Sequence, residues 1–295
     1  MCNPASFIVT KGFKVFWSKR HDGHTDICKE FELSENDEAR IKSVQVEITP
    51  PNGEFETPLK DWVYKTDQDL LPDWWDAKDA EKHCRAALED WAKCRLVRAG
   101  ERRDVNDGEK VTAVCGSGQV GTVCGSGQVG TVCGSGQVGY VCDFGQVGTV
   151  RASGKVGNVC DSGQVGTVCG SGQVGTVRDS GQVGTVYDSG HVGTVRDSGQ
   201  VEYVYGSGQV GTVCDSGKVG NVCDSGQVEY VCDSGQVEYV RDSGQVGTVC
   251  GSAIVSFYCN FSVALSGPFS VIIDRTKSKA RRIVGTEKER IVKSK

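Results

Sequence analysis

The sequence predicts a mainly β protein: a β-solenoid of nine-residue repeats with about 18 residues per coil, preceded by a small α+β domain. The prediction rests first on periodicity. From Val105 to about Phe257 the unit Val-(Cys/Arg/Tyr)-(Gly/Asp)-Ser-Gly-Gln-Val-(Gly/Glu)-(Thr/Tyr/Asn) occurs seventeen times in succession. With Val114 as position 1, valine recurs at positions 1 and 7, while positions 2, 3, 8 and 9 vary. A fixed short period of this kind is typical of a solenoid or array.

The second observation is the chemistry of the variable positions. They accept arginine and glutamate, which are costly in a dry core, so we expect them to face solvent and the valines to face inward. Side chains alternate along a flat strand, yet Val120 and Val123 are three residues apart and both are expected inside. We therefore expect one corner between them and another at the Gly/Asp-Ser-Gly turn formers. Regular corners of this kind favour a solenoid of about eight coils, two units per coil, over an antiparallel meander.

Residues 1–104 are expected to form the α+β domain. The β-rich runs 7–10 and 14–17 flank Lys11-Gly12 and predict a hairpin, and residues 42–48 alternate as a half-buried strand. Residues 62–64 form a further short strand in this interpretation.

Two helices are also expected in this domain. Thr25 is a candidate cap for a short helix that runs to Leu33. Residues 73–96 place apolar side chains at three- and four-residue spacing, with acidic residues near the start and basic residues near the end, as the helix dipole favours. The apolar stripe of this helix is interpreted as core.

The repeat array, 105–257, is followed by two short segments. Bulky apolar residues in 258–274 predict a cap, because an uncovered last coil would expose a sheet edge. Residues 275–295 hold 9 Lys/Arg against 2 Asp/Glu and are expected to be a basic, disordered tail. A nucleic acid or an acidic partner is expected only through this tail, since the array itself is acidic.

The composition indicates a cytoplasmic protein without a cofactor. No apolar run reaches transmembrane length, and the N-terminus lacks the basic and apolar regions of a signal peptide. Ten of the 15 cysteines occupy position 2, where other units carry Arg or Tyr. The codons for these residues differ by one nucleotide, so the sequence favours drift among duplicated units over a disulfide or metal framework.

Three resemblances bear on the fold and source. The segment from Val249 to Val255 resembles the hexapeptide repeat of left-handed β-helices, and the nine-residue period resembles the calcium-binding RTX roll, although the Gly-Gly-x-Gly-x-Asp loop is absent. The opening Met-Cys-Asn-Pro-Ala-Ser-Phe with Val-Phe-Trp-Ser at 15–18, followed by these repeats, resembles uncharacterised proteins of phages and prophages. That resemblance implies no activity and no catalytic residues.

Candidate chemistry is sparse. Cys2 would become an N-terminal nucleophile if Met1 were removed, but no companion motif follows it. His21, His24, Asp26 and Cys28 are metal-ligand types whose spacing fits no closed zinc pattern.

Threonines at position 9, in contrast, are expected to form ladders like those of ice-binding solenoids, interrupted by Tyr and Asn.

The function expected from the sequence is that of a non-enzymatic structural or interaction protein, which presents a rigid repeat surface to a protein partner. The alternatives are an enzyme or host-factor inhibitor with its site in residues 1–104, and an ice- or ligand-binding solenoid.

Overall fold

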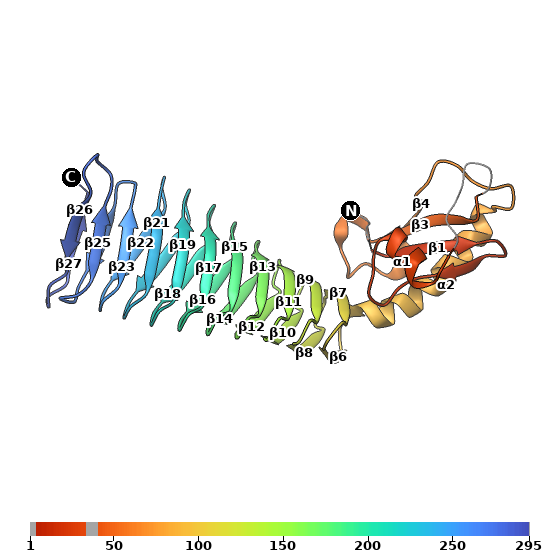
Figure 1. The fold of residues 1–295 in the computed structure, drawn as a ribbon, viewed down its shortest axis with the longest axis horizontal. Coiled ribbons are helices and arrows are strands. Elements are labelled where there is room, and N and C mark those ends of the chain that lie inside the picture. The colour runs from red at the N-terminus through yellow and green to blue at the C-terminus, as the bar shows by residue number, and fades with distance from the viewer. Residues whose placement is uncertain (1–3, 34–40, 295) are drawn as a thin grey trace. The chain divides into compact units, whose positions relative to one another are not determined.

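A computed structural model describes residues 4–33 and 41–294 and divides the chain into two compact units. The N-terminal unit comprises Met1–Leu96 and Glu109–Ala113. Its four-stranded antiparallel sheet has the order β2-β1-β3-β4 (Figure 1). The strands are β1 Ser6–Thr10, β2 Lys14–Phe16, β3 Ser43–Thr49 and β4 Val63–Thr66. The predicted hairpin is confirmed by antiparallel pairing of β1 with β2.

The helices of this unit differ in how they begin. Helix α2, Ala77–Arg95, is capped by Asp76, whose carboxylate accepts hydrogen bonds from the backbone N–H of Lys78 and Asp79 at 2.9 Å each. Helix α1, His24–Glu30, begins at Gly23 without a side-chain cap. The prediction that Thr25 caps it is wrong, because Thr25 lies inside the first turn. Two 3₁₀ turns, η1 Pro51–Gly53 and η2 Leu59–Asp61, connect β3 to β4.

The buried side of the sheet packs on α2. Trp62 and Trp91 meet edge to face with ring centroids 6.0 Å apart, and both are almost fully buried. The fully buried Arg95 forms an ion pair with Asp22, which also pairs with Lys110 at 2.6 Å. Burial lowers the pKa of Arg95 and the Asp22 carboxylate opposes that effect.

The second unit is a β-solenoid with 18 residues per coil, as the sequence predicts, and it has about 10 turns where about eight coils are expected from the repeats. Each coil contributes one strand to each of two parallel sheets (Figure 1). We call the sheet of β6, β8 and the further even-numbered strands the even sheet, and the other the odd sheet. The even sheet contains β6 Arg102–Val105, β8 Gln119–Val123, β10 Gln137–Val141, β12 Lys155–Val159, β14 Gln173–Val177, β16 His191–Val195, β18 Gln209–Val213, β20 Gln227–Val231, β22 Gln245–Val249, β24 Ser262–Leu265 and, out of numerical sequence, β27 Arg290–Lys293.

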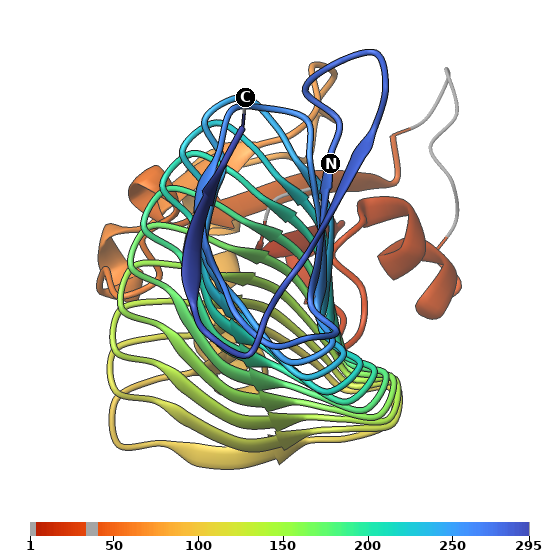
Figure 2. The same ribbon diagram turned by 90° about the vertical axis from the view of Figure 1, so that its left-hand side faces the viewer.

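The odd sheet has the same construction. Its members are β5 Leu96–Val97, β7 Lys110–Val114, β9 Gln128–Val132, β11 Gln146–Val150, β13 Gln164–Val168, β15 Gln182–Val186, β17 Gln200–Val204, β19 Lys218–Val222, β21 Gln236–Val240, β23 Ile254–Phe257, β25 Val271–Asp274 and, out of numerical sequence, β26 Arg281–Val284. Within the repeats each paired strand residue is opposite the residue 18 positions along the chain, as in Val165 with Val183. Viewed along the stack, the coils lie one behind another with a gradual rotation (Figure 2).

Both valines of each unit face inward, and a single strand carries them. Val120 and Val123 are at most 2 % exposed although they belong to the same five-residue strand. The corner expected between these two valines therefore does not interrupt the strand. Strict alternation cannot bury both side chains, so the strand must bend locally between the two valines. The paired register agrees, because it includes positions 6, 7, 9 and 1 and omits position 8.

The second expected corner is a tight turn with two backbone constraints. Position 3 has a φ of 50–64° in every unit from Gly116 to Gly251, whether the residue is Asp, Gly or the single Ala152. Only Gly, and to a lesser extent Asp or Asn, adopts this region at low cost. At position 5, a Cβ added to Gly163 would lie 2.3 Å from the carbonyl oxygen of Val141 on the coil before. Glycine at position 5 is thus required by the contact between coils.

The C-terminal end departs from the sequence-based boundaries. Strands β24 and β25 continue the parallel stacking through residues 258–274. The expected disorder of residues 275–295 is not observed: β26 pairs antiparallel with β25, and β27 with β24. These pairings satisfy backbone groups that the last coil would otherwise leave open.

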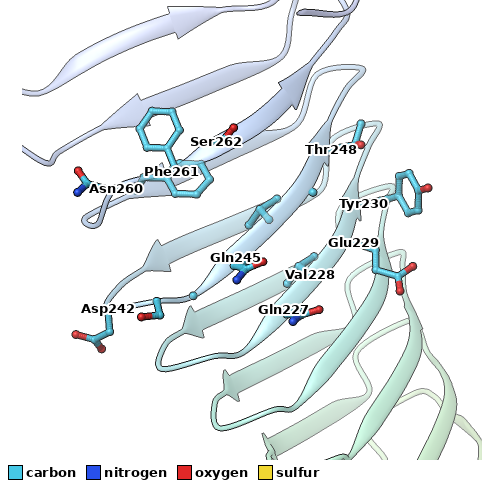
Figure 3. Close-up of a pocket in the computed structure, with 15 residues that line it drawn as sticks. Gln227, Val228, Glu229, Tyr230, Asp242, Gln245, Thr248, Asn260, Phe261 and Ser262 are labelled. Carbon is cyan, nitrogen blue, oxygen red and sulfur yellow. The ribbon is translucent and has the colours of Figure 1, made fainter. Parts of the chain in front are cut away.

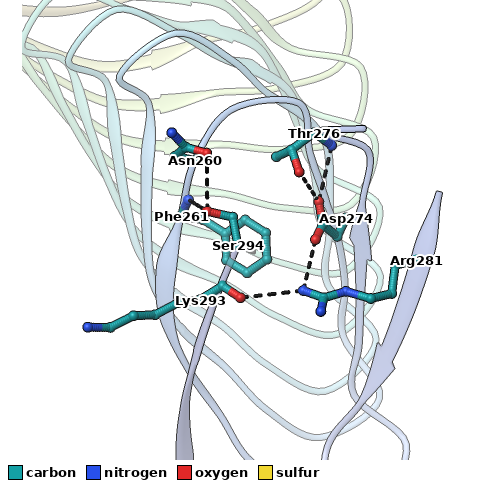
Figure 4. A network of polar contacts seen from close by, with 7 residues as sticks. All are labelled: Asn260, Phe261, Asp274, Thr276, Arg281, Lys293 and Ser294. Carbon is teal, nitrogen blue, oxygen red and sulfur yellow. Dashed lines mark hydrogen bonds and ion pairs between the residues drawn. The ribbon is translucent and has the colours of Figure 1, made fainter. Parts of the chain in front are cut away.

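Side chains hold β26 and β27 in these pairings (Figure 4). Asp274 accepts hydrogen bonds from the Thr276 hydroxyl at 2.6 Å and from Arg281 at 2.9 Å. Burial raises the pKa of Asp274, but these hydrogen bonds and the Arg281 charge outweigh it and hold the pKa below its ordinary value. The Ser294 hydroxyl accepts from the Phe261 backbone N–H at 3.3 Å. The cap of the solenoid thus lies later in the chain than 258–274.

The inward and outward positions of a unit should respond very differently to charge. Val183→Asp places an unpaired carboxylate at a site that is 0 % exposed, and we expect it to destabilise the solenoid by more than about 3 kcal/mol. Cys169→Arg changes a half-buried position that other units fill with Arg, and we expect a change of about 0.5 kcal/mol or less. Thermal melts of both variants check this. If Cys169→Arg unfolded the solenoid and Val183→Asp did not, the assignment of inward and outward positions would be wrong.

The turn at Ala152 offers a stabilising substitution. Its φ of 54° strains an alanine, so we expect Ala152→Gly to raise the free energy of unfolding by about 1 kcal/mol. Chemical denaturation measures the difference. Ala113→Gly, at a buried strand position, is the control and should destabilise.

Candidate functional site

The even sheet carries a long groove on its outer face. The groove has a volume of about 790 Å³ and follows five successive repeat strands, β8 to β16. Its floor is the position-8 glycines, which expose backbone because they have no side chain. The glycines are Gly121, Gly139, Gly157, Gly175 and Gly193. At a strand spacing of about 4.8 Å, this floor is about 19 Å long.

The walls of the groove are polar and nearly neutral. One wall is the position-6 column, in which glutamines are joined by Lys155 and His191. Thr122 and Tyr140 face the groove near its N-terminal end, where Arg102 and Asp104 also line it. Glutamine amides and threonine hydroxyls each donate and accept hydrogen bonds, so the wall offers both functions at regular intervals.

A second hollow, of about 840 Å³, lies on the same sheet towards the C-terminal end (Figure 3). Gln227 and Gln245 line it from successive strands, and Asn260 and Phe261 line it from the coil beyond. Glu229 is in its lining where the first groove has glycine. Both hollows therefore belong to the outer face of the even sheet, and each has a half-exposed tyrosine in its lining, Tyr140 and Tyr230.

The expected threonine ladders are present but short. In the odd sheet the register aligns four threonines in succession, and in the even sheet three. Tyr203 ends the first run and Tyr230 the second. Each ladder is a single column flanked by glycine at position 8, so neither sheet presents a broad threonine face. Ice binding stays a prediction from the sequence.

The N-terminal unit does not assemble the predicted metal-ligand set. His24 is buried; its Nε2 lies 3.2 Å from the carbonyl oxygen of Val46, to which it donates, and its Nδ1 lies 3.6 Å from Asp67. Among the described residues, the ligand atoms of His24 cluster with those of Glu47 and Asp67. His21 and Asp26 are exposed and Cys28 is half-buried; none belongs to that cluster.

We interpret the cluster of His24, Glu47 and Asp67 as structural, because contacts of the His24 ring connect parts of the N-terminal unit. The ring connects α1 to β3 and to Asp67, just beyond β4, with Nε2 engaged by a carbonyl oxygen. Cys2, the candidate nucleophile, lies outside the described residues.

Sequence reasoning missed the groove because it treated all units as equivalent. If successive units are assigned alternately to two columns, one for each sheet, the column of the even sheet has glycine at position 8 in every unit from Gly121 to Gly211. The odd column lacks a run of this length, because Glu202 interrupts it.

Comparisons with known proteins add no family. A scan against protein-family models, a search of curated proteins and a search of solved structures each found no match to this chain. Within residues 4–33 and 41–294, no helix is both long and apolar enough to cross a membrane.

Proposed function

We propose that this chain is a non-enzymatic interaction protein whose solenoid holds an extended, hydroxyl-rich chain, such as a linear glycan, along the outer face of the even sheet. The groove from Gly121 to Gly193 is the observation that carries the proposal. A straight, repeating groove suits a partner that is itself extended and repeating, because each coil offers the same contacts one strand spacing further along.

The chemistry of the lining supports this class of partner. Position-6 glutamines offer paired donor and acceptor groups, which match hydroxyl groups without requiring charge. Tyr140 lines the groove and Tyr230 lines the second hollow, and each ring is about half exposed and therefore accessible for stacking on a sugar ring. The excess of acidic residues in the array disfavours a nucleic acid in the same groove.

A rigid groove also lowers the cost of binding. The backbone of each coil is held by hydrogen bonds to both neighbours, so the wall residues start from fixed positions. The sequence resemblance to phage proteins suggests a setting in which such a surface would contact a host-cell or virion polymer.

The chain itself supplies a way to fill the groove without a foreign residue. Glutamate occupies position 8 at Glu202, Glu229 and Glu238, and glycine occupies position 8 on both coils beside Glu202 and beside Glu229. We expect Gly157→Glu with Gly193→Glu, which leaves Gly175 between them, to lower the affinity for a linear oligosaccharide at least tenfold. A printed array of linear oligosaccharides, followed by titration of the best binder, measures the effect.

The matched control is Gly130→Glu with Gly166→Glu, the same change on the odd sheet, which leaves Gly148 between the two glutamates. It should leave the affinity within twofold of the unchanged chain and shift the melting temperature by a similar amount. The proposal fails if no oligosaccharide is retained, or if both double variants bind as the unchanged chain does.

A further inference from the structure

The two-unit coil sorts the ten position-2 cysteines into two columns. Successive units alternate between the sheets, so residues 18 apart become neighbours. The column that follows the even sheet reads Cys124, Cys142, Cys160, Arg178, Arg196, Cys214, Cys232, Cys250. Six of the ten cysteines therefore form two uninterrupted runs of three in this column, and the other four lie in the second column.

The C-terminal run contains a compact set of ligand atoms. The Sγ atoms of Cys214 and Cys232 and a carboxylate oxygen of Asp233 all lie within 4.8 Å of one another. The backbone N–H of Cys232 donates to Val213, the residue before Cys214, at 2.9 Å, which fixes the two thiols on adjacent coils. Asp233 occupies the left-handed turn position with φ 52°, and its side chain is exposed.

The surroundings of these thiols are negative. Burial, together with Asp233 and the neighbouring thiols Cys250 and Cys214, raises the pKa of Cys232 to about 12. Burial also raises the pKa of Cys214, with Asp215 and Asp233 acting in the same direction and Arg196 opposing them. The carboxylates of Asp215 and Asp233 place negative charge beside the two sulfurs, and negative charge favours a bound cation.

We propose that Cys214, Cys232 and Asp233 form a binding site for a thiophilic divalent cation of the Zn²⁺ class. Two sulfurs and one oxygen make three of the four ligands of a tetrahedral ion, and water takes the fourth position. Tetrahedral Zn–S bonds of about 2.3 Å need sulfurs about 3.8 Å apart, so the side chains approach each other by about 1 Å or less. Binding is not a redox step: the ion replaces the two thiol protons, which pass to solvent.

The N-terminal run of the same column is a natural comparison. Its cysteines also stack on adjacent coils, but their Sγ atoms form no such set with a carboxylate in the described structure. The Asp143 carboxylate there accepts a hydrogen bond from the Gly125 backbone N–H at 3.4 Å instead.

Site-resolved thiol labelling tests the proposal on the full chain. The reduced protein is pulsed with a maleimide with and without one equivalent of Zn²⁺, and each cysteine is read by peptide mass spectrometry. We expect Zn²⁺ to slow labelling of Cys214 and Cys232 at least tenfold and to leave Cys160 and Cys169 unchanged.

Two isosteric variants separate a metal site from general thiol chemistry. Asp233→Asn removes a ligand, and Asp224→Asn makes the same change at an equivalent turn in the other column; asparagine tolerates the left-handed backbone at both. We expect about a tenfold rise in the Zn²⁺ concentration for half-protection with Asp233→Asn and none with Asp224→Asn. Equal protection of all position-2 cysteines, no protection, or an equal response of the two variants would overturn the proposal.

Discussion

The hydrogen-bond ladder between coils, repeated every 18 residues, is the constraint on which the rest of the solenoid depends. Ordering nine residues costs on the order of 9 to 18 kcal/mol of backbone entropy, whereas burying two valines returns roughly 3 to 6 kcal/mol. No unit is stable alone, so each coil depends on its neighbours. The ladder also brings equivalent side chains into columns, and these columns produce both the groove floor and the cysteine runs.

Much of this architecture follows from the sequence, because the inward positions are so uniform. Valine at positions 1 and 7 predicts the buried columns, which the structure confirms from Val120 to Val255. The period and the turn formers predict a two-unit coil. The hairpin and the long amphipathic helix of the N-terminal unit are predicted correctly because their local sequence patterns agree with their tertiary packing.

Other features depend on contacts that periodicity does not contain. Variation between Asp and Gly at position 3 resembles free drift, but the backbone there has positive φ and restricts the choice. The basic residues 275–295 resemble a disordered tail, yet the open edges of the last coil give β26 and β27 strands to pair with. The candidate site was hidden for a related reason: the groove and the thiol runs exist only after alternate units are assigned to different sheets.

The alternation of sheets also determines how such a chain can change in length. Gain or loss of 18 residues adds or removes one whole coil and leaves every downstream residue in its original column. Gain or loss of nine residues moves all downstream units to the opposite sheet. A single-unit duplication near Gly175 would bring Glu202 into the even column and shorten its run of position-8 glycines from six to five, and one near Cys223 would separate Cys214 from Cys232, although both would preserve every buried valine. Unequal recombination among these units therefore can change the surface completely while it leaves the core intact.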